Sequence, residues 1–153
     1  KFRIILIIFS LIGLALALFL AYEYAQPQPI GCPLHAGNSA NPCETVRQSE
    51  YSKLLGVELP YWGTIFFVIM IVSLIVYLIK KKWLLSKFIE SRIDLYFLGL
   101  SIFGIAFETY YFFLQLFVIK AVCTWCVMVW AVVLSVFVIN LVSLRGSLRG
   151  VFK

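Results

Sequence analysis

Four long apolar segments alternate with polar segments along the chain, and this pattern predicts the fold class. Each segment is about as long as the roughly 20 residues that a helix needs to cross a bilayer, and none alternates apolar and polar residues as a barrel strand does. A helix also satisfies every backbone amide within its own segment, as a membrane requires. We therefore predict an all-α integral membrane protein, a single domain over residues 1–153 whose four-helix bundle has spans at about residues 4–22, 61–79, 95–118 and 122–144.

Composition supports a membrane protein and bears on the first segment. Hydrophobic residues make up 63% of the chain and charged residues 13%, which leaves too little polar surface to cover a soluble globule. Lys1 and Arg3 before the first apolar segment resemble the start of a signal peptide. That segment is longer than a signal core of about 7–15 residues, and the sequence after it is not a typical small-residue cleavage site. We therefore interpret residues 4–22 as a span.

The positions of lysine and arginine predict the orientation. Cytoplasmic loops are rich in these residues, and ten of the 13 lie before the first span, between the second and third, or after the fourth. The other three are Arg47, Lys53 and Lys120. Both termini are thus predicted to be cytoplasmic, with the loop 23–60 extracytoplasmic, in the cytoplasmic membrane of a prokaryote or the ER membrane of a eukaryote. Topology accounts for the net charge of +6, so we expect the lipid bilayer and no nucleic acid as a partner.

All four cysteines are predicted to face the extracytoplasmic compartment, where disulfides form and persist. Cys32 and Cys43 lie in the loop 23–60, and Cys123-Thr-Trp-Cys126 opens the fourth span. Cysteines three residues apart share one helical turn and can close a small disulfide. The positive end of the helix, with Lys120 just ahead, favours the reactive thiolate. The motif therefore indicates a redox-active dithiol at the membrane surface.

The loop 23–60 is interpreted as a lid. Its two Gln-Pro steps at residues 26–29 predict an extended, stiff start. Residues 44–55 are predicted to form a short helix that ends at Gly56, with Val46 and Ser49 on one face.

These residues resemble a known family. The run from Cys43 to Gly56, a Pro60-x-x-Gly63 at the second span, and the run from Leu114 to Cys126 look like the vitamin K epoxide reductase family, particularly its bacterial and archaeal branch. The resemblance covers nearly the whole chain, and its pieces fall in the family's order.

The resemblance implies a role for each cysteine. Cys126 would lie beside a quinone (ubiquinone, menaquinone or vitamin K), and Cys123 would take electrons from Cys43. Cys32, paired with Cys43, would exchange with a thioredoxin-like (DsbA-type) protein in trans. The chain would then be a quinone-dependent disulfide oxidoreductase that supports disulfide bond formation.

Ser49 and Trp130 are the further cofactor-binding residues that the resemblance implies. Ser49 matches the family's serine near the active site and could bond the quinone or orient Cys43. Trp130 stands where the vertebrate enzymes have a tyrosine that bonds vitamin K, and an indole N–H differs in reach. This difference favours plain quinone reduction, with vitamin K epoxide reduction as the alternative.

Other interpretations remain open at this point. Glu108, well inside the third span, is either a proton carrier for the quinone or a structural neutral acid. Cys32, His35, Cys123 and Cys126 could instead bind a structural zinc, although Cys43 would then be stranded and our main interpretation has no metal. A small transporter or assembly subunit with bracing disulfides is the third possibility; it predicts that Cys126 is dispensable.

Overall fold

The computed structural model of the chain describes residues 2–33, 41–80 and 87–151. Four of its helices are long and apolar enough to cross a membrane. This confirms the predicted all-α membrane bundle. The four helices are α1 (Phe2–Ala25), α3 (Leu59–Lys80), α4 (Lys87–Leu114) and α5 (Thr124–Val151).

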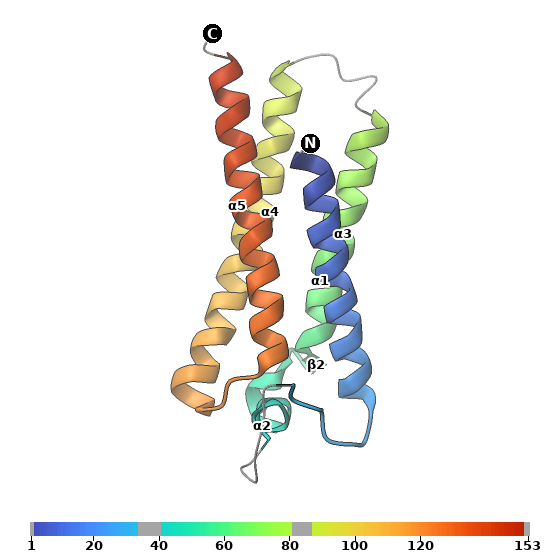
Figure 1. Cartoon of the computed structure of the whole chain (residues 1–153), viewed down its shortest axis with the longest axis vertical. Coiled ribbons are helices and arrows are strands. Elements are labelled where there is room, and N and C mark those ends of the chain that lie inside the picture. The colour runs from blue at the N-terminus through green and yellow to red at the C-terminus, as the bar shows by residue number, and fades with distance from the viewer. Residues whose placement is uncertain (1, 34–40, 81–86, 152–153) are drawn as a thin grey trace.

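The four helices associate as two pairs (Figure 1). Helix α1 packs along α3, α4 packs along α5, and the contact of α1 with α5 joins the pairs, whereas α3 and α4 touch little. Both chain termini lie at one end of the bundle, which we call the terminal end. The short helix α2 (Pro42–Gln48) and the loop around it lie at the opposite end, which we call the cysteine end.

The terminal half of the bundle is filled by close packing. Next to it, near the middle of α1, a Cβ atom added at Gly13 would overlap the ring of Phe67, so glycine lets this ring pack closely there. Arg3 pairs with Asp94, and its guanidinium lies 4.2 Å from the ring centre of Tyr77. Buried side chains from all four spans form the core of the terminal half: Leu6, Met70, Leu74, Tyr77, Phe97 and Val136.

The segment between α1 and α3 differs from the prediction in its second half. The helix predicted over residues 44–55 ends at Gln48, because Ser49 is extended and its hydroxyl donates to the carbonyl of Val46 at 2.7 Å. A 3₁₀ turn (Glu50–Ser52) and a hairpin of β1 (Lys53–Leu54) and β2 (Val57–Glu58) follow. Leu55 and Gly56, both with positive φ, form its turn.

Helix α4 ends in a π-helical turn, Gln115–Ile119. Lys120 then takes the left-handed conformation, and its amide caps the turn by bonding the carbonyl of Gln115. The chain reverses there and enters α5 at Thr124. This tight reversal places the first turn of α5 beside the end of α4.

Candidate redox site

The Cys-x-x-Cys motif lies at the start of α5. Thr124 is the first helical residue, and the carbonyl of Cys123 accepts the first helical bond, from the amide of Val127 at 3.1 Å. Cys126 follows within the first turn, and its amide lies 3.4 Å from the sulfur of Cys123. Both residues are thiols in this structure. The two sulfurs therefore share one helical turn, as the spacing predicts.

The local environment favours the thiolate of Cys123. A hydrogen bond from the Cys126 side chain is the main reason that the pKa of Cys123 is lowered, and the amides of Cys126 and Trp125 add to it. Burial acts in the opposite direction, since Cys123 is only 1% exposed. Cys123 is thus the sulfur of this pair that is set up to react as a nucleophile.

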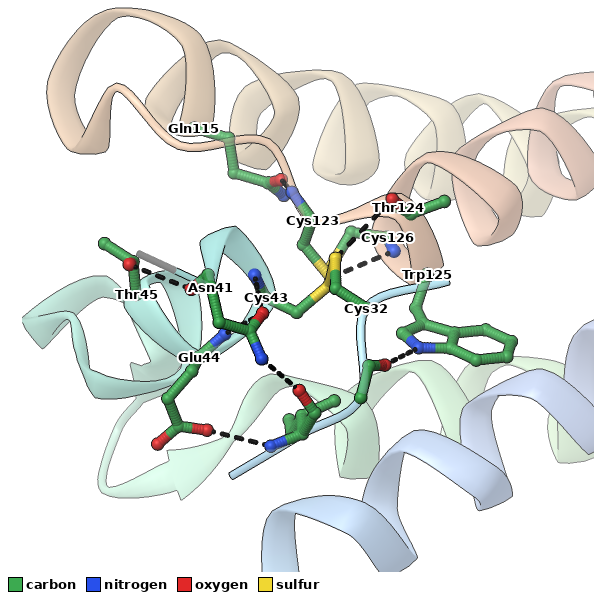
Figure 2. Close-up of a disulfide and its surroundings, with 12 residues drawn as sticks. Cys32, Asn41, Cys43, Glu44, Thr45, Gln115, Cys123, Thr124, Trp125 and Cys126 are labelled. Carbon is green, nitrogen blue, oxygen red and sulfur yellow. Dashed lines mark hydrogen bonds between the residues drawn. A yellow bond between two sulfur atoms is a disulfide. The ribbon is translucent and has the colours of Figure 1, made fainter. Parts of the chain in front are cut away.

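Gln115 supports the motif from the end of α4. Its side-chain oxygen accepts a hydrogen bond from the amide of Cys123 at 2.9 Å (Figure 2), and the residue is buried. The π-helical turn after Leu114 brings the two residues together. Sequence reasoning did not single out Gln115; the signal was an amide among apolar residues, close before the motif.

Cys32 and Cys43 form a disulfide in the structure. Cys43 is 1% exposed and belongs to the same buried cluster as Cys123, whereas Cys32 is half-buried. Figure 2 shows the side chains of all four cysteines converging. The structure therefore brings the loop pair against the helix pair, with Cys32 as the more accessible sulfur of the disulfide.

The two middle residues of the motif hold the loop. The hydroxyl oxygen of Thr124 lies 3.6 Å from the sulfur of Cys32, and the indole N–H of Trp125 donates to the carbonyl of Gly31 at 2.8 Å (Figure 2). The Trp125 ring also packs against Phe19 of α1, with ring centres 4.7 Å apart. The residues between Cys123 and Cys126 thus seat the loop disulfide on α5.

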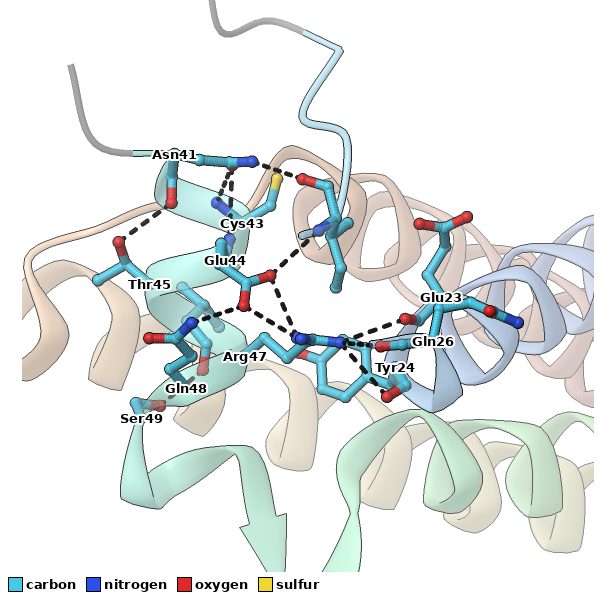
Figure 3. Close-up of polar contacts among 12 residues, drawn as sticks. Glu23, Tyr24, Gln26, Asn41, Cys43, Glu44, Thr45, Arg47, Gln48 and Ser49 are labelled. Carbon is cyan, nitrogen blue, oxygen red and sulfur yellow. Dashed lines mark hydrogen bonds and ion pairs between the residues drawn. The ribbon is translucent and has the colours of Figure 1, made fainter. Parts of the chain in front are cut away.

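Asn41 and Glu44 attach α2 to the chain segment before Cys32 (Figure 3). The Asn41 side chain caps α2 by accepting from the amides of Cys43 and Glu44, and its NH₂ group donates to the carbonyl of Ile30. Glu44 accepts from the amide of Ile30 at 3.1 Å. Burial would raise the pKa of Glu44, but this amide, Gln48 and Arg47 together hold it below its ordinary value. The carboxylate is therefore part of what orders the loop.

Arg47 ties α2 to the end of α1. Its guanidinium donates to the backbone carbonyls of Glu23, Tyr24 and Gln26, the last at 2.8 Å (Figure 3). It also pairs with Glu44 at 3.1 Å. Carbonyls at and just after the end of a helix lack the full set of helical donors, so Arg47 supplies bonds to them. We use the name lid for the described residues 26–33 and 41–58 that this network holds in place.

A largely apolar cavity opens beside Cys126. Residues of all four spans and of α2 line it, including Ala17, Leu20, Val46, Phe107 and Val129. Its polar atoms come from a few side chains: Tyr24, Ser49, Tyr51, Glu108, Tyr111 and Gln115. An apolar chamber with a few polar groups next to a reactive sulfur is typical of a site for a small aromatic substrate.

A second cavity adjoins the first. It shares Gly63, Phe107 and Glu108 with the first cavity and continues between α3 and α4, where Trp62, Phe66 and Phe103 line it. This is the seam at which the two helices touch little. Apolar space thus runs from Cys126 toward the side of the bundle.

The structure brings Ser49, but not Trp130, to the cavity beside Cys126. Ser49 lines the cavity at the end of α2. Trp130 is absent from the lining: its ring stacks on Phe112, and its indole N–H donates to the hydroxyl of Thr109 at 3.3 Å. In the structure, Trp130 therefore contacts α4, and its predicted contact with a cofactor stays a prediction.

One of the proposed zinc ligands is engaged in a disulfide. The sulfur of Cys32 is bonded to Cys43, and His35 lies outside the described residues. Within residues 2–33, 41–80 and 87–151, no group of three or more His, Cys, Asp or Glu side chains is arranged so that it could hold a metal ion.

The chain is similar to a known protein family. The sequence model of the vitamin K epoxide reductase family matches residues 4–141, most of the chain. No curated protein matches it.

Proposed function

The chain belongs to the vitamin K epoxide reductase family, and we propose that it passes electrons from a thioredoxin-like partner through its two cysteine pairs to a quinone. Family membership and the four apolar helices make it a multi-pass membrane oxidoreductase. The observation that carries the finer proposal is the seating of the Cys32–Cys43 disulfide against the helix pair, beside an apolar cavity that Cys126 lines.

The outer step is exchange with the partner. A partner thiolate attacks the sulfur of Cys32, which is the accessible one, and Cys43 leaves as a thiolate. The partner's second thiol then displaces Cys32 from the mixed disulfide. The partner becomes oxidised, and Cys32 and Cys43 become thiols. Such a partner would be a separate protein whose own oxidation supports disulfide bond formation in other proteins.

The inner step transfers the same two electrons along the chain. The Cys43 thiolate attacks Cys123 of an oxidised Cys123–Cys126 pair, and Cys126 leaves. Cys32 then attacks Cys43, which restores the loop disulfide and releases Cys123. The arrangement in the structure, a loop disulfide with Cys123 and Cys126 as thiols, corresponds to the product of this step. The buried position of Cys43 in the cluster of Cys123 supports it.

The quinone is proposed as the substrate that finally accepts the electrons. The cavity beside Cys126 fits a quinone ring, since its walls are mostly apolar and its polar side chains, Ser49 among them, can bond carbonyl oxygens. The adjoining cavity between α3 and α4 would take an apolar tail. Ubiquinone, menaquinone and vitamin K all have this shape. Trp130 is not included in the proposed site, because it lies outside the lining.

The side and kind of membrane are proposed from charge. Ten of the 13 basic residues lie in the sequence before the first span, between the second and third, or after the fourth, which supports a cytoplasmic position for the terminal end by the positive-inside rule. The cysteine end then faces the extracytoplasmic compartment, where disulfides persist. We propose the cytoplasmic membrane of a prokaryote, or the ER membrane if the source is eukaryotic.

The test is quinone reduction by the purified protein, driven by a reduced thioredoxin-like protein. Cys126→Ala should reduce turnover to background, because the electrons then have no exit from Cys123. Met128→Ala is the matched control: it removes a sulfur-containing side chain from the same turn of α5, but one that is 40% exposed and outside the cavity lining. Full turnover in Cys126→Ala, or none in the folded wild-type protein with any quinone, would contradict the proposal.

A further inference from the structure

The proposed quinone reduction requires two protons as well as two electrons. This inference rests on the proposed function. Two sulfurs supply the electrons when the Cys123–Cys126 bond forms. In the proposed inner step Cys123 is released from the mixed disulfide as a thiolate, a form that its lowered pKa favours, so this residue contributes electrons and brings no proton. The thiol of Cys126 brings one. The second proton must come from another group that reaches the cavity.

Glu108 is the acidic residue of this cavity. Among the residues that line it, Glu108 is the one carboxyl side chain, and Glu108 also lines the adjoining cavity between α3 and α4. It lies seven residues before Gln115 on α4, two helical turns along the face that supports Cys123. Within the part of the chain that the structure describes, the side chain of Glu108 has no hydrogen bond or ion pair.

A carboxyl group without a partner in this cavity is expected to be neutral and able to donate a proton. An ionised carboxylate without a cation is costly within a membrane span. A neutral carboxyl carries one O–H, which is a strong donor toward a carbonyl oxygen. The hydroxyls of Tyr24, Tyr51 and Tyr111 share the cavity, but a phenol is a weaker acid than a carboxyl by about six pKa units. Glu108 is therefore the best proton donor present.

We propose that Glu108 is the catalytic acid that donates a proton to a quinone oxygen in this cavity. In the balanced step, the Cys123 thiolate and the Cys126 thiol form a disulfide, and their two electrons reduce the quinone. One proton leaves Cys126 and one leaves Glu108, so that both carbonyl oxygens become hydroxyls. Glu108 is left as a carboxylate, and the single negative charge moves from Cys123 to Glu108.

The cavity also connects Glu108 to a source of protons. A polar groove beside α2 shares Ser49, Tyr51 and Ile119 with the cavity. Water in this groove would return a proton to Glu108 after each turnover. The cycle then needs no proton path through the terminal half of the bundle, which is filled by Leu6, Met70 and Leu74.

The test compares Glu108→Gln with the wild-type protein in a single turnover. Protein whose four cysteines have been reduced is mixed with a short-chain quinone, and the quinone absorbance is followed. Glutamine keeps the size of the side chain but cannot transfer a proton, so reduction should slow by about 10²–10⁴-fold. Glu108→Asp, which keeps the acid, should retain more activity. Tyr110→Phe is the matched control: it is two residues along α4, 57% exposed and outside the cavity lining.

A spectroscopic readout tests Glu108 without relying on turnover. Infrared difference spectra are recorded on adding quinone to protein whose cysteines are all oxidised, so that no reduction occurs. A protonated carboxyl band should shift in the wild-type protein and be missing in Glu108→Gln. Exchange between the partner and Cys32 should be unchanged in the variant, which shows that it is folded.

The outcomes separate this proposal from the proposed function. If wild-type protein fails to reduce any quinone, both fall. If wild-type protein reduces quinone and Glu108→Gln does so equally fast, the role of Glu108 is overturned while the relay stands. An unshifted carboxyl band in the wild-type protein would also overturn it. A slow Glu108→Gln with normal exchange, partial rescue in Glu108→Asp and a shifted band supports it.

Discussion

The two cysteine pairs are held in place by different kinds of contact. The loop pair depends on a polar network in which Asn41, Glu44 and Arg47 tie α2 to its neighbours. The helix pair is part of α5, and the packing of α5 against α1 and α4 fixes it. A few polar contacts in water are easier to break than the packing of long helices. The loop pair is therefore the one that can move during a relay.

The pairs also differ in what surrounds them. Cys32 is accessible at the surface of the lid, while Cys126 lines an apolar cavity. Exchange with a protein needs an accessible sulfur, whereas a quinone needs apolar walls. Cys43 and Cys123, each 1% exposed, meet between these two environments. The two pairs thus divide the work: the loop pair is placed for exchange with a protein, and the helix pair is placed for reaction with a quinone.

Removing Cys32 should have the largest effect on electron transfer between the two pairs. In Cys32→Ser, Cys43 can still attack Cys123, but no sulfur remains to resolve the mixed disulfide. We expect partner-driven turnover to fall to background and a Cys43–Cys123 bond to accumulate. Peptide mapping under non-reducing conditions identifies the bond. Cys43→Ser, the matched control, should form no such bond, and a link from Cys43 to Cys126 in Cys32→Ser would contradict the proposed order.

Loosening the lid should have an intermediate effect. Arg47→Met keeps the length of the side chain but removes the donor to three carbonyls at and just after the end of α1, and the partner of Glu44. Charged hydrogen bonds contribute about 2 kcal/mol, so the lid should open about 30-fold more often. The measurement is the rate at which a phosphine reduces the loop disulfide.

Lys53→Met provides the control for Arg47→Met. Lys53 is an exposed cation of the same lid, in β1, so its loss changes the charge but no carbonyl contact. The phosphine should reduce the loop disulfide of Lys53→Met at a rate close to that of the wild-type protein. Equal rates in both variants would mean that charge, rather than the attachment of α2 to α1, controls access to the disulfide.

The parts of the molecule that the sequence predicts are those with a local cause. Each apolar segment is long enough to determine its own helix, and Cys126 follows Cys123 by one helical turn wherever α5 lies. The break of the helix at Ser49 also has a local cause, since its hydroxyl bonds the carbonyl of Val46. That signal is in the sequence, although a continuous helix through residue 55 is equally consistent with the pattern.

The remaining features depend on how helices pack, which the pattern does not determine. Gln115 reaches Cys123 only because of the π-helical turn and the left-handed Lys120. Trp130 is four residues from Cys126, so both share one side of α5, yet α4 covers Trp130 while the cavity reaches Cys126. A single sequence does not show which helix packs against which face of α5.

The smallest predicted effect concerns the charge on Glu44, the acid of the polar network. Its pKa is lowered from the ordinary 4.5 in the folded protein. The ionised carboxylate therefore stabilises the docked lid at pH values above 4.5, and this contribution is lost as the pH falls through the lowered pKa. Glu44→Gln keeps an acceptor for the amide of Ile30 but never carries the charge. At pH 7 the phosphine should reduce the loop disulfide of Glu44→Gln a few-fold faster than the loop disulfide of the wild-type protein.

Acid should then remove the difference between the two proteins. The wild-type rate, divided by the rate of Glu44→Gln at the same pH, cancels the phosphine's own dependence on pH. This ratio should rise toward one as the pH falls below about 4, because protonated Glu44 and glutamine are both neutral. A ratio that stays constant down to pH 2.5 would show that the amide of Ile30, rather than the charge on Glu44, holds the loop pair over Cys123. The polar network that holds the loop pair would then be weaker than the packing around the helix pair but no more sensitive to pH. The lid would not open in acid.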